Sequence, residues 1–422
     1  MEVVNDTGDR AAAGDGRHRF SSALNVGRVV SAAVLIGMVL SHCVTMRAQV
    51  ASGRQQVSGR PNQSQMGAGD SGAELQREAE AELQTGTALS RKGLFREAIP
   101  HLLAARGRAA NEYAASFNLA LCYVGTKQFR PAIEVLNGLR RDGHDGVDVE
   151  SLLSQAYIGS SQPQEALASL QKAAILSPQN EKLYVFVADA CMDHKDYGLG
   201  LKVVAIGLRN LPQSARLHYE RAMFLVQLDQ LDRAKQDFEL AGKLAPASEI
   251  GYLAAAHEEL LEGDIAEAVR TAREAVKQGY KNPALLTVLG EALIRSGVNS
   301  GQPEFAEAQT ALETAVRQRP DDPASQIALG SLYLMASRYG DAIIHLEKAR
   351  QLEPDNPSAY AYLAKAYQRH GDVQQAQDTL AALEKLNREQ AERISSAPGD
   401  RRAGYAGRAV AEEEPAAASH PQ

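Results

Sequence analysis

The chain of 422 residues has no tryptophan and few other large rings, with 8 phenylalanines and 14 tyrosines. This supply is too small for a typical β-sandwich, β-barrel or base-stacking platform. Only three cysteines are present, without a Cys-x-x-Cys pair, which disfavours a disulfide framework or a cysteine-based metal module. Positive charge is not in excess, since 45 basic residues face 52 acidic ones. Because phosphate binding needs a concentrated positive face, no nucleic-acid partner is expected.

Motifs of the common catalytic classes are also missing. The chain contains no HExxH, GxSxG, P-loop or dinucleotide-binding fingerprint, and His101, His257 and His345 have no matching Asp or Cys at ligand spacing. We therefore predict no enzymatic activity, no cofactor, no metal and no small-molecule substrate. The remaining composition is rich in Ala and Leu, with 44% hydrophobic and 23% charged residues, which favours an all-α globular fold.

The amino-terminal region has the character of an export signal. Residues 1–28 are polar, are predicted to be disordered and end in arginines, and an apolar run extends from Val29 to Val44. We interpret residues 29–46 as a signal peptide or a transmembrane anchor, because the run exceeds a usual signal core but falls short of the roughly 20 residues that cross a bilayer. Lipidation at Cys43 and a buried soluble helix stay open as interpretations. Export would place the protein at the periplasmic face of a bacterial inner membrane, or in the periplasm or medium after cleavage.

Two segments of low complexity flank the central region. In residues 47–72, Gly, Ser and Gln replace almost every apolar residue, so we predict a flexible linker. Residues 395–422 are rich in Ala, Gly, Arg, Glu and Pro, and are predicted to form a disordered tail. Residues 73–394 between them carry the folded domain.

A 34-residue repeat fills this central region. One small residue recurs every 34 positions, with a single step of 40, and a second precedes it by 12 positions, or by 18 in the seventh repeat. The first set is Ala98, Ala132, Ala166, Gly200, Ala234, Ala268, Ala308, Ala342 and Ala376; the second is Gly86, Ala120, Ser154, Ala188, Ala222, Ala256, Gly290, Gly330 and Ala364. We call them crossing residues, because positions restricted to Gly, Ala or Ser indicate two helix backbones that cross closely. Each repeat is therefore predicted to be a helical hairpin.

Further positions of the repeat support a family resemblance. Four residues after the second-helix crossing residue stands a mostly large apolar side chain, and Pro178, Pro212, Pro246, Pro320 and Pro354 follow at twelve. The pattern resembles the tetratricopeptide repeat over residues 79–390. Arg221 and Glu259, in normally apolar positions, depart from it. The resemblance implies nine hairpins stacked in a right-handed solenoid, whose first helices line a concave groove that receives a peptide.

Two groove chemistries of that family are absent, since of the positions required for a carboxylate clamp or an asparagine ladder only Asn118 matches. First-helix positions that the resemblance leaves outside the hairpin seam are instead largely apolar, and we expect them to be exposed and to bind a partner. The alternative is tighter packing of the array on itself. The candidate groove residues are Phe117, Asn118, Leu121, Asp189, Tyr219, Met223, Leu253, His257, Ile327, Lys365 and Arg369.

These expectations combine into one function. We predict a non-enzymatic scaffold of the cell envelope that binds protein or peptide partners in the groove and attaches to the membrane through its amino-terminal segment. The alternative is a regulatory or targeting subunit of an envelope enzyme complex, whose partner would carry the activity. An enzyme in its own right would need a catalytic domain that the segments outside the repeats are too short to hold.

Overall fold

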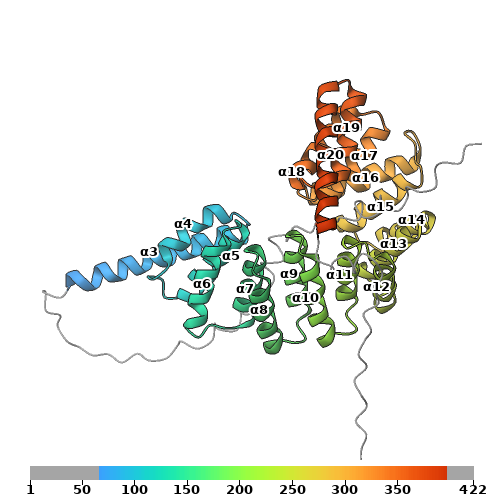
Figure 1. Cartoon of the computed structure of the whole chain (residues 1–422). Helices are drawn as coiled ribbons and strands as arrows, with labels where there is room; N and C mark the ends of the chain where they lie inside the picture. Colours follow the sequence, from blue (N-terminus) through green and yellow to red (C-terminus); the bar gives the residue numbers. More distant parts are fainter. Residues whose placement is uncertain (1–65, 397–422) are drawn as a thin grey trace, which may run out of the picture. The chain divides into compact units, whose positions relative to one another are not determined.

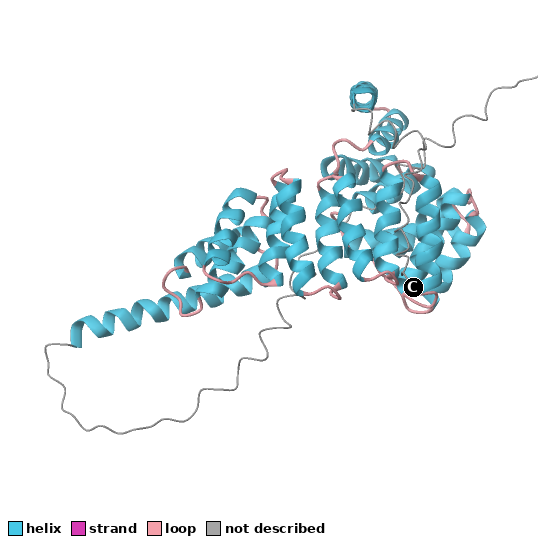
Figure 2. Ribbon diagram, turned by 60° about the horizontal axis from the view of Figure 1, so that its bottom comes forward, coloured by secondary structure: helices cyan, strands magenta, loops and turns pink. Residues whose placement is uncertain are grey.

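The computed structural model describes residues 66–396, where all regular elements are α-helices and no strand is present (Figures 1 and 2). The 18 helices are α3 (Met66–Arg91), α4 (Phe95–Ala105), α5 (Glu112–Gly125), α6 (Phe129–Arg141), α7 (Val147–Gly159), α8 (Pro163–Leu176), α9 (Glu181–Asp193), α10 (Tyr197–Asn210), α11 (Ala215–Gln227), α12 (Leu231–Leu244), α13 (Glu249–Glu262), α14 (Ile265–Lys277), α15 (Pro283–Arg295), α16 (Pro303–Gln318), α17 (Pro323–Met335), α18 (Tyr339–Leu352), α19 (Pro357–His370) and α20 (Val373–Ser396). The all-α prediction is thus confirmed.

The predicted N-region 1–28, the signal or anchor 29–46 and most of both low-complexity segments lie outside the described residues. Within residues 66–396 no helix has the length and apolar character required to span a membrane. Helix α3 begins at Met66, inside the segment 47–72 for which a linker is predicted, and α20 ends at Ser396, just inside the predicted tail.

The described residues fall into two compact units. One comprises residues 66–224 and 237–254, and the other comprises residues 225–236 and 255–396. We call them the N-terminal unit and the C-terminal unit. In each, consecutive helices pack as pairs, α3 with α4 through α9 with α10 in the first, and α15 with α16 through α19 with α20 in the second. The hairpin prediction is therefore confirmed in both units.

The crossing residues lie at tight packing contacts between helices. All eighteen are buried. The Ser154 hydroxyl donates a hydrogen bond to the Ala166 carbonyl at 2.8 Å, directly across the pair. A Cβ on Gly330 would lie 2.6 Å from Leu346 and 3.3 Å from the Ala342 carbonyl oxygen. Because contacts this short leave no room for a larger side chain, packing explains the restriction to small residues.

A left-handed residue closes the turn of every hairpin. It stands five positions before the second-helix crossing residue, or eleven in the hairpin with the inserted loop. The set is Gly93, Lys127, Ser161, Lys195, Asp229, Gly263, Gly297, Ser337 and Gly371. In the second hairpin the Gln128 amide donates to the Tyr123 carbonyl at 2.7 Å, which is the Schellman pattern of a helix end. Five of the nine turns therefore place a side chain in a conformation that usually favours glycine.

Four prolines between hairpins accept a recurring hydrogen bond. A polar side chain in the first turns of the following helix reaches back six residues to the proline carbonyl. The pairs are Tyr184 with Pro178 at 2.9 Å, His218 with Pro212 at 3.1 Å, Gln326 with Pro320 at 2.8 Å and Tyr360 with Pro354 at 2.7 Å. Each satisfies a carbonyl that the helix end leaves without a backbone partner.

The two departures from the repeat pattern have polar partners. Arg221 donates from Nε to the Asp237 carboxylate at 2.7 Å, and Asp237 also lies 3.0 Å from His218. Glu259 accepts a hydrogen bond from the Thr271 hydroxyl at 2.9 Å. Each polar substitution in the seam is thus accompanied by a matching group on the second helix of its hairpin, which limits the cost of its burial.

The seam position four residues after the second-helix crossing residue is buried in eight hairpins. In the ninth, Leu380 is 48% exposed, so the expectation that it fills the seam is wrong there. The reason is that no described helix follows α20 to cover it. The inserted residues 298–303 lie between α15 and α16 or at the start of α16, as expected from a loop insertion.

Candidate peptide-binding cleft

Most of the predicted groove residues are not exposed. Nine of the eleven side chains are buried, and only Lys365 and Arg369 face solvent. The buried ones are Phe117, Asn118, Leu121, Asp189, Tyr219, Met223, Leu253, His257 and Ile327. The expectation that these side chains are exposed to solvent is therefore wrong. The alternative, that the array packs more tightly on itself, describes them instead.

Ring and amide contacts show what these side chains do. Phe117 stacks on Tyr113 with ring centroids 5.7 Å apart, and Tyr219 packs against Phe238 at 5.5 Å. The Asn118 amide donates to the Ala114 carbonyl at 2.8 Å. Their apolar surface is buried against neighbouring helices, because burying large apolar side chains stabilises the fold.

Lys365 and Arg369 lie four residues apart on α19, near the end of the array. Both are exposed, and neither forms an ion pair with the residues that the structure describes. They remain accessible to an acidic partner, although a pair of solvated surface cations contributes little by itself.

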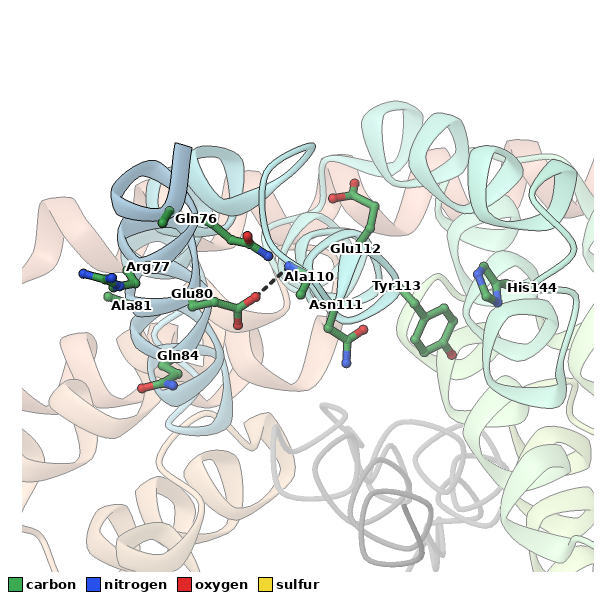
Figure 3. A pocket seen from close by; sticks show the side chains of 11 residues that line it. Gln76, Arg77, Glu80, Ala81, Gln84, Ala110, Asn111, Glu112, Tyr113 and His144 are labelled. Atoms are coloured by element: carbon green, nitrogen blue, oxygen red, sulfur yellow. Dashed lines mark hydrogen bonds between the residues drawn. The ribbon is translucent and has the colours of Figure 1, made fainter. Parts of the chain in front are cut away.

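A cleft of about 1010 Å³ opens in the N-terminal unit, between α3 and the start of α5 (Figure 3). Its lining comes from α3, from the segment that leads into α5 and from the connection before α7: Ala73, Gln76, Arg77, Glu80, Ala81, Gln84, Ala110, Asn111, Glu112, Tyr113 and His144. Most of these side chains are polar. The volume lies at the upper end of the range for ligand pockets, which suits a peptide segment better than a small molecule.

One wall of the cleft is a single face of α3. Gln76, Glu80 and Gln84 follow one another at intervals of four residues, so they stack along the helix. Glu80 accepts a hydrogen bond from the Ala110 amide at 2.6 Å, which ties α3 to the segment before α5 (Figure 3). The wall therefore presents two exposed side-chain amides on either side of an anchored carboxylate.

The opposite wall is the segment from Ala110 to Tyr113. Asn111 caps α5 by accepting from the Ala114 amide at 2.9 Å, and Glu112 accepts from the Gly107 amide at 2.6 Å. The Tyr113 ring lies 5.0 Å from the His144 ring. Tyr113 and His144 thus form an aromatic corner on the side of the cleft away from α3.

The polar side chains of the cleft differ in whether they make hydrogen bonds within the protein. Both carboxylates, Glu80 and Glu112, accept backbone hydrogen bonds. Gln76, Gln84 and Arg77 make no hydrogen bond or ion pair within the described part of the chain. Because a side-chain amide carries both donors and an acceptor, Gln76 and Gln84 can pair with the main chain of an extended peptide.

Sequence reasoning missed most of this cleft. Tyr113 lies in the first turn of α5, and His144 lies in the connection before α7. Arg77 lies in the N-terminal half of α3. The four-residue spacing of Gln76, Glu80 and Gln84 was the available signal. No cluster of three metal-ligating side chains is present among residues that the structure describes, and Cys122 and Cys191 are free and buried.

Three tetratricopeptide-repeat family models match the chain. Their matches cover residues 83–146 and 301–357, residues 215–248, and residues 333–397. No curated protein matches the sequence.

Several solved structures are similar to the chain. One is a tetratricopeptide repeat protein from Parabacteroides merdae ATCC 43184, with 17% identity, a TM-score of 0.44, and coverage of 60% of this chain and 98% of that one. Another is a chain of the APC/C hetero-tetramer Cut9–Hcn1, with 14% identity, a TM-score of 0.43 and coverage of 74% and 75%. A third is YrrB, described as having an unusual peptide-binding site, with 17% identity, a TM-score of 0.31 and coverage of 44% and 93%.

Proposed function

The chain is a tetratricopeptide repeat protein, and from this premise we propose that it is a non-enzymatic scaffold that binds a peptide segment of a partner protein. The observation that carries the proposal is the cleft between α3 and the start of α5, with its unoccupied amides and its aromatic corner. Proteins of this kind generally bind other proteins or peptides.

An extended peptide is the ligand that best suits the cleft walls. Gln76 and Gln84 are about two helical turns apart, roughly 12 Å along α3. An extended chain covers that distance with three to four residues at roughly 3.3 Å each. Its main chain would pair with the two amides, while one side chain would rest on the corner of Tyr113 and His144. Arg77 at the margin adds a preference for a carboxylate in the ligand.

Crosslinking tests the placement of the partner. With p-benzoylphenylalanine in place of Gln84, the full chain should crosslink to a partner in its native cell extract. The same replacement at Glu165, which is exposed on α8, is the matched control and should give no such product. Equal crosslinking from both positions, or none from Gln84, would place the partner elsewhere.

We propose that the scaffold works in the bacterial cell envelope. The support is the apolar run from Val29 to Val44, which follows a region ending in arginines. Residues 29–46 would attach the array to the inner membrane or be removed on export, and the repeats would then stand on the periplasmic side. Protease treatment of intact spheroplasts tests this. Digestion of the array is expected, and full protection would contradict export.

A further inference from the structure

The last hairpin has one helix face that no neighbouring helix covers. In the hairpin before it, the equivalent face is covered by α19, which packs on both α17 and α18. Ile327, Ala349 and Ala359, one from each of these three helices, form a buried cluster at this contact. Within the described residues no helix follows α20, so the corresponding face of α19 and α20 lacks such a cover.

Comparison with the preceding hairpin shows which side chains this leaves exposed. Leu346 on α18 is fully buried, whereas Leu380, 34 residues later on α20, is 48% exposed. Ala328 on α17 is 4% exposed, whereas its equivalent Tyr362 on α19 is 39% exposed. Val373, two helical turns before Leu380, is also exposed. We call the surface formed by Tyr362, Val373 and Leu380 the end face.

Two cations border the apolar part of the end face. Lys365 and Arg369 follow Tyr362 by three and seven residues, so the three side chains lie along one stripe of α19. Both cations are exposed, and neither forms an ion pair with the residues that the structure describes. A segment that covers the end face should therefore combine apolar side chains with negative charge.

The carboxyl-terminal segment of this chain carries that combination. Residues 397–422 follow α20 directly and lie outside the described residues. Tyr405 and Val410 are the two large apolar side chains of this segment, and the acidic run of Glu412, Glu413 and Glu414 comes after them. A segment that returns along α20 would thus bring its apolar side chains to the end face first and its acidic run last.

The segment is long enough to reach the two cations. Helix α20 has 24 residues, so a chain that leaves it at Ser396 must travel about 35 Å to return to the start of α20, beside Arg369. Glu412 stands 16 residues after Ser396, and an extended chain of that length covers up to roughly 50 Å. The acidic run therefore reaches Lys365 and Arg369 with length to spare.

A further charge on α20 agrees with this direction. Glu384 is exposed and lies one turn after Leu380, about 6 Å along the helix. Arg408 precedes Val410 by two residues, which is about 7 Å in an extended chain. If Val410 rests on Leu380, Arg408 comes to the Glu384 carboxylate. The acidic run then continues toward the cations of α19.

We propose that residues 405–414 of this chain dock in extended form on the end face and cover the last hairpin. The segment is predicted to be disordered by itself, and it would order through its contacts with the face. A second copy of the chain suits the face less well, because a symmetric contact would bring two sets of the same cations together. The docked segment would also block the end of the array to other chains.

Photo-crosslinking in the purified full chain tests the docking. With p-benzoylphenylalanine in place of Leu380, we expect an intramolecular crosslink to residues 405–414, identified by mass spectrometry after digestion. The same replacement at Ile344, which is 65% exposed on α18, is the matched control and should give little of this product. The triple variant Glu412→Gln, Glu413→Gln, Glu414→Gln should lower the yield from Leu380 by roughly two- to tenfold, since it removes the exposed ion pairs.

A charge exchange tests the direction of the docked segment. Glu384→Arg should lower the crosslink yield from Leu380, because it would place a cation against Arg408. Arg408→Glu in the same chain should restore the yield. Failure of the second substitution to restore the yield would overturn the proposed direction.

Four other results would overturn the docking itself. Equal tail products from Leu380 and Ile344 would show only that the tail is tethered nearby. A product of twice the chain mass would make a second copy the occupant of the end face. The same conclusion against docking would follow from the absence of any tail product, or from an unchanged yield in the triple variant.

Discussion

The two units fill the same positions of their first helices with side chains of different chemistry. In the N-terminal unit, Tyr219 and Met223 are fully or almost fully buried. The equivalent positions of α15 in the C-terminal unit carry Thr287 and Glu291, beside the buried Asp322. The repeat therefore fixes where a side chain stands on the backbone, but not whether that side chain is apolar, polar or ionisable.

Replacement of Met223 by Glu should have the largest effect. The side chain is buried, so a carboxylate there would be desolvated without a partner. We expect the free energy of unfolding to fall by about 3 kcal/mol or more. Urea denaturation measures it, with Lys365→Glu on exposed α19 as a control that should stay within about 0.5 kcal/mol. A stable Met223→Glu protein would mean that the position is exposed after all.

Replacement of a crossing glycine by alanine should be destabilising in both units. A Cβ at Gly200 would lie 2.2 Å from Phe224, and one at Gly330 would lie 2.6 Å from Leu346. Gly200→Ala and Gly330→Ala should each cost about 1–3 kcal/mol. The matched controls are Gly198→Ala, on the same helix as Gly200, and Gly340→Ala, on the helix that pairs with that of Gly330. A Cβ at either control position would have open space, so both variants should be neutral or slightly stabilising, because alanine favours a helix. A neutral result at Gly200 would remove the packing explanation of the repeat.

Glu291→Gln should stabilise the protein, and more so as the pH rises. The folded pKa of Glu291, about 8, stands above its ordinary value of 4.5, so the native state holds a proton that the unfolded state has lost between those values. Wild-type stability should therefore fall as the pH rises through this window, and glutamine removes that loss. Urea midpoints at pH 5 and pH 8.5 test the difference, which should be larger at pH 8.5. An equal difference at both values would contradict the raised pKa of Glu291.

The smallest effects are expected from the tyrosine contacts to proline carbonyls. Tyr360→Phe removes one hydrogen bond to Pro354, and should cost about 0.5–1 kcal/mol. Tyr184→Phe should cost more, up to about 1.5 kcal/mol, because the Tyr184 hydroxyl also accepts from the Asn210 amide at 2.8 Å. Thermal melting of the two variants side by side gives the order, and a larger loss for Tyr360→Phe would contradict it.

The crossing residues show how much of the fold could be predicted from sequence. Helix positions such as Ala132 and Gly330 carry their own signal, because a close crossing admits only small side chains. Exposure carries no such signal. Tyr219 is buried because neighbouring helices pack against it. That packing cannot be deduced from the position of Tyr219 in the repeat.

The candidate cleft was largely beyond sequence reasoning for a related reason. His144 and Tyr113 meet because two separate connections approach one another, and no spacing in the chain encodes that contact. The face of α3 was predictable in part, from Gln76 and Gln84 at helical intervals. Which of these amides stay unpaired depends on backbone groups such as the Ala110 amide, which only the folded structure places beside Glu80.

The most direct test is the dissociation constant of the captured partner for the wild type and for the double variant Gln76→Ala, Gln84→Ala. Both side chains are exposed, so melting should be unchanged while binding weakens about tenfold or more. Glu165→Ala on α8 should leave both quantities as they are. An unchanged dissociation constant in the double variant would contradict peptide binding in the cleft.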